Sequence, residues 1–264
     1  MVMGGKTQAG YWLCRDCRDK FTVRTGTVME RSHVPLHKWL LATHLIAASK
    51  KGMSAKQMER MLGVTYKTAW FLCHRIREAM APTVQTPPLG GAGKFVEVDE
   101  TFVGGKQRNR AFKEVAPKKV VVSLVERDGK ARSFHVANIN AATLRPILVQ
   151  KVDRASTLMT DKYPGYVKLG REFTGGHFSV DHEKAQYAIG QFHSNTVENF
   201  FSIFKRGVIG TYHHLSEAHL ARYLAEFDLR ANTRDMNDGE RAAEIFQGGI
   251  GRRLTYRRTD RLAA

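Results

Sequence analysis

Three acidic residues of this sequence lie in predicted strands or helices, where burying a charged side chain costs free energy. Asp99 falls in the middle of "VEVDETFV", whose alternating apolar residues predict a strand. Asp161 ends "STLMTD", a second predicted strand. Glu198 lies in "HSNTVENFFSIFKRG", whose apolar residues recur at helical spacing. Because a buried acid must be paired, hydrogen-bonded or bound to metal, these three predict a carboxylate site.

Such a site suits divalent metal. Mg²⁺ prefers carboxylate oxygens and keeps positions for water and phosphate oxygens. Two Mg²⁺ or Mn²⁺ ions held by Asp99, Asp161 and Glu198 would serve an attacking water or hydroxyl and the leaving 3′ oxygen of a phosphodiester. Simpler roles stay open at this point: a hydrogen-bonded Asp99, a turn-capping Asp161, and a solvated pair of Glu198 with Lys205, seven residues further along the same helix stripe.

The elements that must position these acids follow from the same patterning. Strands are predicted in residues 94–103, 119–138 and 156–161, with an Asp-Gly hairpin turn at Asp128 and Gly129. Helices are predicted in residues 141–152 and from Asn195 through Arg234. Strands that begin with a hairpin and are followed by helices predict an α/β fold, with a mixed sheet flanked by helices.

The charge of the chain indicates its partner. Among 264 residues, 42 are Lys or Arg and 25 are Asp or Glu, a net charge of +17. This excess predicts a polyanionic partner, with nucleic acid foremost and other kinds of basic protein as the alternative. No apolar run reaches the roughly 18 residues of a membrane span. The start of the chain lacks the apolar core of a signal peptide, so we expect a cytoplasmic protein without a membrane partner.

Residues 53–80 have the layout of a helix-turn-helix, although a plain helical hairpin would share it. Ser54 and Thr65 are placed to cap two helices, and Gly63 permits the tight turn between them. The residues expected to face inward are Met58, Met61, Leu62, Ala69, Leu72, Cys73 and Ile76. Those expected to reach DNA bases or phosphates are Tyr66, Lys67, Thr68, Arg75 and Arg77.

Cys14 and Cys17 form a single C-x-x-C, which is half of a zinc ribbon. Structural zinc takes four ligands, usually from two such knuckles. The remaining cysteine, Cys73, belongs to the predicted helix-turn-helix core. We therefore expect a ribbon remnant with two unligated thiols, and zinc binding by Cys14 and Cys17 is the alternative.

Three motifs, in this order, resemble the DDE-type bacterial insertion-sequence transposases of the ISXO-like branch: "VEVDETFVGGK", "LMTDKYPGY" and "HSNTVENFFSIFKRGVIGTYHHLS". With the upstream "RTGTVMERSHVPLHKWLL", the resemblance covers about residues 11–234. It implies an RNase H-like catalytic domain that cleaves element ends with divalent metal and transfers the 3′ hydroxyl into target DNA.

The resemblance also implies roles for individual residues. Asp99 and Asp161 match the two catalytic aspartates, Glu198 matches the third acid, and Lys205 matches the basic residue two turns after it, which can hold a DNA phosphate. Apart from the resemblance, the charge of Arg206 suits a phosphate contact or a solvated surface position. In such families Asn sometimes replaces the third acid. Asn195 is one turn before Glu198; we place Glu198 first because it is charged and is followed by Lys205, and interpret Asn195 as a helix cap.

These inferences predict five regions. They are a partial zinc-ribbon remnant (1–30), an all-α helix-turn-helix domain (31–81), a Pro- and Gly-rich linker (82–94), the RNase H-like domain (95–236) and a loosely held basic tail (237–264). Relatives often begin with two knuckles, so we expect a truncated or misassigned N-terminus. The expected partners are double-stranded DNA, as terminal inverted repeats and target, and a second copy of the chain. A DNA-binding regulator with an inert catalytic domain and a structure-specific nuclease are the alternatives.

Overall fold

The chain folds into two compact units. The computed structural model describes residues 2–3, 10–83, 86–104, 117–180, 188–189 and 192–255. The first unit comprises Met1–Ser49, Met53–Ala81 and Met236–Ala264. The second comprises Lys50–Gly52 and Pro82–Asp235. The first unit is therefore assembled from both ends of the chain.

The first unit is mainly helical. Its short strands β1 (Val2–Met3), β2 (Trp12–Leu13) and β3 (Lys20–Phe21) pair antiparallel in that order. Its helices are α1 (Leu36–Ala48), α2 (Ala55–Leu62), α3 (Tyr66–Met80) and α8 (Asp238–Gly248). Trp39 and Ile46 of α1 are almost fully buried and contribute to the unit's core.

The connection between α2 and α3 follows the predicted capping pattern. The Ser54 side chain accepts a hydrogen bond from the Gln57 amide, and the Thr65 side chain accepts one from the Thr68 amide. Gly63 ends α2 with a φ of 57°, a left-handed conformation that glycine adopts without strain. The predicted inward residues are buried except Met61, which is 47% exposed.

The interpretation of residues 237–264 as a loosely held tail was wrong for its first part. Asn237 and Glu240 form a reciprocal capping box that starts α8, and α8 packs against α1 and α3. Ala242 and Ile245, three residues apart, are its buried face. The many arginines further along this segment obscured that short apolar stripe. Residues 256–264 of the predicted tail lie outside the described part of the chain.

The second unit contains a five-stranded sheet in the order β6-β5-β4-β7-β8. Its strands are β4 (Phe95–Val103), β5 (Lys119–Glu126), β6 (Ala131–Val136), β7 (Thr157–Asp161) and β8 (His177–Val180). The pairs β4–β5 and β5–β6 are antiparallel, whereas β4–β7 and β7–β8 are parallel. The mixed sheet confirms the α/β prediction and is compatible with an RNase H-like fold.

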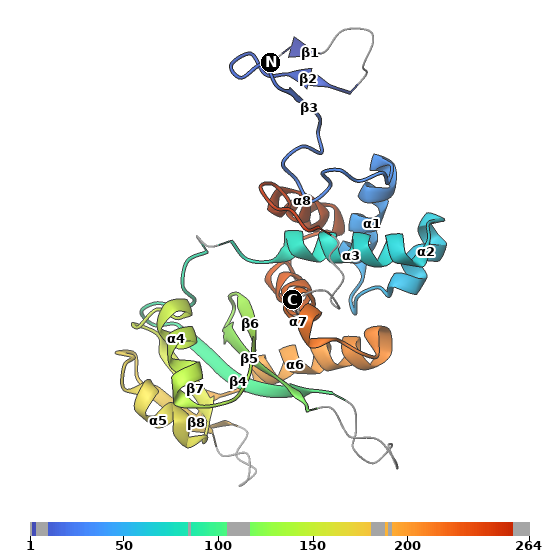
Figure 1. The fold of residues 1–264 in the computed structure, drawn as a ribbon. Helices are drawn as coiled ribbons and strands as arrows, with labels where there is room; N and C mark the ends of the chain where they lie inside the picture. Colours follow the sequence, from blue (N-terminus) through green and yellow to red (C-terminus); the bar gives the residue numbers. More distant parts are fainter. Residues whose placement is uncertain are drawn as a thin grey trace, which may run out of the picture. The chain divides into compact units, whose positions relative to one another are not determined.

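Helices cover both faces of this sheet, as Figure 1 shows. They are α4 (Ala141–Lys151), α5 (Pro164–Gly170), α6 (Asn195–Gly207) and α7 (Glu217–Asn232), with a π-helix, η3 (Val208–Tyr212), after α6. Val96 and Val98 pack into one core with residues of α4 and α5, and Val121 packs into another with residues of α6 and α7. A two-stranded hairpin, β9 (Ala188–Ile189) and β10 (Phe192–His193), precedes α6. No helix in the described ranges combines the length and apolar character that a bilayer crossing requires.

A buried carboxylate joins α7 to the sheet. Asp228 accepts hydrogen bonds from the Ser133 amide (2.8 Å) and the Ser133 hydroxyl (2.7 Å) of β6. Burial raises the pKa of Asp228 to about 6, against the lowering effect of those two bonds and of Arg132. The native protein therefore binds this proton more tightly than the unfolded chain does.

Because the native pKa of Asp228 is raised, its contribution to stability is complete at low pH and is lost as the pH rises through about 6. Replacing it by Asn should remove this dependence. We expect the unfolding free energy of wild type, relative to Asp228→Asn, to fall by about 2 kcal/mol between pH 4 and 7. Urea denaturation at several pH values measures it. Asp235→Asn, at an exposed acid, is the control, and a constant difference between wild type and Asp228→Asn would contradict the assignment.

Candidate metal centre

The parallel pairing of β4 and β7 brings the first two predicted acids to one level of the sheet. Phe95 lies beside Thr157, and Glu97 lies beside Met159. Two residues further along both strands, Asp99 therefore stands level with Asp161. The two aspartates are 62 positions apart in sequence, and the strand register alone makes them neighbours.

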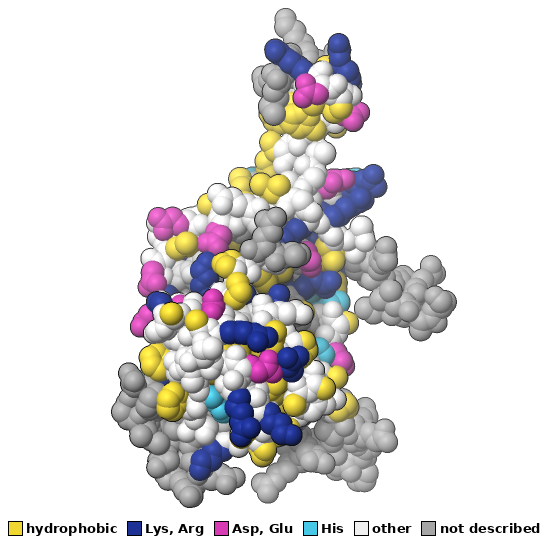
Figure 2. Space-filling model, turned by 90° about the vertical axis from the view of Figure 1, so that its left-hand side faces the viewer, with side chains coloured by type: hydrophobic (Ala, Val, Ile, Leu, Met, Phe, Trp, Pro, Cys, Tyr) yellow, Lys and Arg dark blue, Asp and Glu magenta, His cyan; other side chains and the backbone are white. Residues whose placement is uncertain are grey.

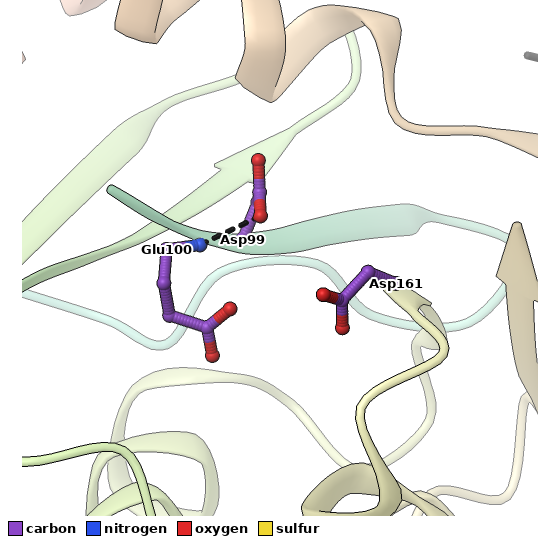
Figure 3. Close-up of side chains that lie close together, drawn as sticks. All are labelled: Asp99, Glu100 and Asp161. Carbon is purple, nitrogen blue, oxygen red and sulfur yellow. Dashed lines mark hydrogen bonds between the residues drawn. The ribbon is translucent and has the colours of Figure 1, made fainter. Parts of the chain in front are cut away.

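A third carboxylate in this group is Glu100, which was not predicted as a site residue. Ligand oxygens of Asp99, Glu100 and Asp161 all lie within 4.8 Å of one another. Asp99 Oδ1 accepts a hydrogen bond from the Glu100 amide at 2.7 Å. Figure 3 shows Asp99 and Glu100 projecting from opposite sides of β4, with the Asp161 carboxylate directed across from β7. The sequence signal that could have identified Glu100 is its position directly after Asp99 in "VDE".

The electrostatics of Glu100 reflect this crowding. Burial, together with the negative charges of Asp161 and Asp99, raises the pKa of Glu100 to about 7, although a hydrogen bond donated by the Tyr166 hydroxyl lowers it. Burial and the neighbouring Glu100 likewise raise the pKa of Tyr166. Three carboxylates this close repel one another, and a divalent cation between them would remove that repulsion.

The donor set fits a hard divalent cation. Carboxylate oxygens are the ligands that Mg²⁺ and Mn²⁺ accept, and all three acids are only partly buried, which leaves access for water or a phosphate oxygen. Asp99 and Asp161 would hold the ion from neighbouring strands. Glu100 is held on the other side of β4 by Tyr166, whose ring lies in the core formed with α4 and α5.

The remaining predicted residues lie on α6. Its predicted apolar face is confirmed, with Val197, Phe200, Phe201 and Phe204 buried. Glu198 is half-buried in the first turn and accepts a hydrogen bond from the Ser194 hydroxyl at 2.9 Å. Among the described residues, Glu198 is not a member of the carboxylate group. The helix begins at Asn195 with Ser194 as N-cap, so the interpretation of Asn195 as the cap was wrong.

Lys205 and Arg206 are exposed near the end of α6, as a phosphate contact requires. Arg206 Nε also donates to the Ser202 carbonyl at 3.2 Å. Figure 2 shows Lys and Arg side chains at several places on the viewed face, with Asp and Glu side chains among them.

The predicted DNA-contacting residues of α3 divide into two groups. Tyr66 and Lys67 are exposed and Thr68 is half-buried, whereas Arg75 and Arg77 are only 5% and 2% exposed. Arg75 donates to the Glu30 carbonyl at 2.6 Å, and its guanidinium lies 5.4 Å from the centre of the Trp39 ring. The prediction of exposure for these two arginines was wrong, because α3 packs against α1, α2 and α8.

Cys14 and Cys17 lie between β2 and β3 as free thiols, Cys17 exposed and Cys14 half-buried. Hydrogen bonds from the Cys17 and Asp16 amides lower the pKa of Cys14. Cys73 is buried in α3, as its predicted place in the helical core requires. The state of the half ribbon toward zinc stays a prediction.

A mixed sheet that brings carboxylates together from neighbouring strands, in a chain with a net charge of +17, is compatible with an enzyme that processes nucleic acid with divalent metal. Residues 88–232 match the ISXO2-like transposase domain family. Over 237 residues the chain is 30% identical to "Uncharacterized protein in transposable element ISH50" of Halobacterium salinarum. The aligned region covers 83% of this chain and 77% of that relative. The chain belongs to the ISXO2-like family of insertion-sequence transposases.

The carboxylate group makes a prediction that does not depend on DNA. Asp99→Asn and Asp161→Asn should each weaken Mn²⁺ binding by more than the roughly 10- to 100-fold that is typical of outer-shell changes, because each removes a charged ligand. Electron paramagnetic resonance of Mn²⁺ titrated into the free protein measures the affinity. Asp153→Asn, at an exposed acid in the loop before β7, should leave it unchanged. Equal affinity in all four proteins would show that the group holds no ion.

Proposed function

We propose that this transposase cuts the phosphodiester at each end of its element and transfers the exposed 3′ hydroxyl into target DNA. The observation that supports the proposal is the placement of Asp99 and Asp161 at one level of neighbouring strands, with carboxylate oxygens within 4.8 Å. Its membership of a transposase family supplies DNA as the substrate class.

Each residue has a distinct task in this proposal. Asp99 and Asp161 supply oxygen ligands from β4 and β7. A divalent ion held there would lower the pKa of the attacking water and stabilise charge that develops on the phosphate. Lys205, exposed two turns after Glu198 on α6, donates to a phosphate oxygen and keeps the DNA strand beside the carboxylates.

The third ligand has three candidates. Glu198 is our first choice because it carries charge and lies in the first turn of α6, where Lys205 follows on the same stripe. Asn195 is exposed at the first position of the same helix and offers an amide oxygen. Glu100 already lies in the carboxylate group, but its contact with Tyr166 holds it on the opposite side of β4 from Asp99.

End-labelled DNA that carries the element's termini tests the proposal with Mg²⁺ or Mn²⁺. Asp99→Ala and Asp161→Ala should reduce cleavage at a defined end by on the order of 10²- to 10³-fold, since each removes several kcal/mol of charge stabilisation. Glu198→Ala should do the same, and Asn195→Ala and Glu100→Gln should retain most activity. Lys205→Ala should raise the KM for DNA more than it lowers kcat.

The same assay distinguishes the rival functions. Asp153→Ala is the control for a surface acid. Sequence-specific binding without metal-dependent cleavage in wild type would favour the regulator with an inert catalytic domain. Cleavage that follows DNA shape, with no defined end sequence and no strand transfer, would favour the nuclease. If Glu198→Ala stays active and either Asn195→Ala or Glu100→Gln loses activity, the residue changed in the inactive variant would be the third ligand.

We further propose that α2 and α3 form a helix-turn-helix that binds the terminal inverted repeats. The exposed first turn of α3, with Tyr66 and Lys67, is the part that supports it, because recognition helices contact base edges with their N-terminal residues. Arg75 and Arg77 are removed from this role by their burial. Two ends must be held together for transposition, so at least a dimer acts on DNA.

Lys67 and Arg75 should therefore respond differently to substitution. Lys67→Ala should weaken terminal-repeat binding and lower the slope of log affinity against log salt by about 1, since one phosphate contact is lost. Its melting temperature should match that of wild type. Arg75→Ala should lower stability by about 2 kcal/mol, because a charged hydrogen bond and ring packing are lost. Fluorescence anisotropy at several salt concentrations and thermal melts measure both; an unchanged salt slope in Lys67→Ala would contradict the placement.

A further inference from the structure

Glu97 is a fully buried acid two residues before Asp99, with 0% of its surface exposed. Its strand neighbours Val96 and Val98 face the core formed with α4 and α5, so Glu97 faces the other side of the sheet, where α6 packs. A buried carboxylate is strongly unfavourable unless its oxygens are satisfied. The partners that satisfy it therefore identify its role.

Those partners are the start of α6. Glu97 Oε2 accepts hydrogen bonds from the amides of Thr196 (2.9 Å) and Val197 (3.0 Å), and Oε1 accepts one from the Thr196 hydroxyl at 3.0 Å. These amides belong to the first turn of the helix, which has no partners within the helix for its N–H groups. The carboxylate also meets the positive end of the helix dipole.

The usual capping residue does not do this work. Ser194 is the N-cap of α6, but its side chain makes no capping bond to the backbone. Its hydroxyl donates instead to Glu198 Oε1 at 2.9 Å. Glu97 thus takes the capping role from a distant strand, and Ser194 is left to orient Glu198.

Arg127, from the β5–β6 turn, fixes this arrangement from a second direction. Its Nε lies 2.6 Å from Glu97 Oε1, and its Nη2 donates to the His193 carbonyl at 2.7 Å, just before α6. The guanidinium carbon is 4.7 Å from the centre of the Phe95 ring on β4. His193 Nδ1 lies 3.3 Å from the same oxygen of Glu97. Both the helix start and the residue before it are therefore held to β4.

We propose that Glu97 is a positioning residue for metal binding: it anchors the start of α6 to β4 and so sets where the third ligand lies relative to Asp99. The inference rests on the proposed function, in which that ligand comes from the first turn of α6. Glu97 contributes no metal ligand, because its oxygens are occupied by the contacts just described. Its effect is exerted through Asn195 and Glu198, which share the anchored turn.

The test compares Glu97→Gln with a matched buried acid. Glu226 of α7 is also 0% exposed and is bound by the Tyr212 hydroxyl (2.6 Å) and Arg230 (2.5 Å). Glu226→Gln therefore removes a similar buried charge away from the start of α6. Thr196→Val, which removes only one hydroxyl donor to Glu97, and Glu97→Asp, which keeps the charge, are the milder variants.

Three measurements separate positioning from general stability. They are Mn²⁺ affinity of the free protein by electron paramagnetic resonance, kcat and KM for end cleavage, and the melting temperature. Glu97→Gln should weaken Mn²⁺ binding and lower kcat by about 10- to 100-fold, the usual cost of losing an outer-shell contact, with KM for DNA nearly unchanged. Thr196→Val should show a smaller effect of the same kind, and Glu97→Asp should restore part of the loss. Glu226→Gln should lower the melting temperature without changing Mn²⁺ affinity.

The outcomes are distinct. Folded Glu97→Gln with wild-type Mn²⁺ affinity would overturn the inference and leave the proposed function intact. An equal loss of affinity in Glu226→Gln would also overturn it, since Glu97 would then act only through stability. If Glu97→Gln does not fold, the test rests on Thr196→Val. Unchanged Mn²⁺ affinity and unchanged kcat in that variant would also overturn the inference. Wild type that binds no Mn²⁺ and cuts no DNA would overturn the proposed function together with the inference.

Discussion

The constraint on which the second unit depends lies in the first half of β4, where Val96 and Val98 are on one face and Glu97 and Asp99 are on the other. Val96 and Val98 bury themselves against α4 and α5, and the alternation of a strand then forces Glu97 and Asp99 toward α6. A buried Glu97 without partners would destabilise the sheet. Helix α6 supplies those partners, because the amides of its first turn have no acceptor within the helix. The contact therefore satisfies both the buried carboxylate and the amides at the start of the helix. Sheet, helix and carboxylates are thereby fixed together.

Much of this arrangement could be predicted because it follows from local patterning. Strand alternation located β4, apolar spacing located the buried face of α6, and the Asp-Gly turn is present with a φ of 55° at Asp128. The level placement of Asp99 beside Asp161 depends on strand register, which no single segment encodes. Glu100 was missed because strand alternation places it on the other face of β4 from Asp99, yet oxygens of both carboxylates lie within 4.8 Å of each other and of Asp161.

Other errors share a physical cause, which is contact between distant segments. Arg75 and Arg77 belong to a helix that begins with the exposed residues Tyr66 and Lys67, and local pattern gave no sign that α8 would return from the far end of the chain to pack against α3. No role was predicted for Glu97 from the sequence. Its partners Thr196 and Val197 lie about 100 positions away, so only the folded chain reveals them.

The return of α8 to the first unit has a consequence for how the protein is made. Residues 82–235 are in effect an insertion between α3 and α8, so the ribosome completes the whole sheet unit before it releases the last helix of the other. Helices α1 and α3 emerge early but lack the partner that buries part of their apolar surface. An N-terminal domain usually folds first during synthesis, but here that order is reversed. The first unit, which contains α2 and α3, is completed last.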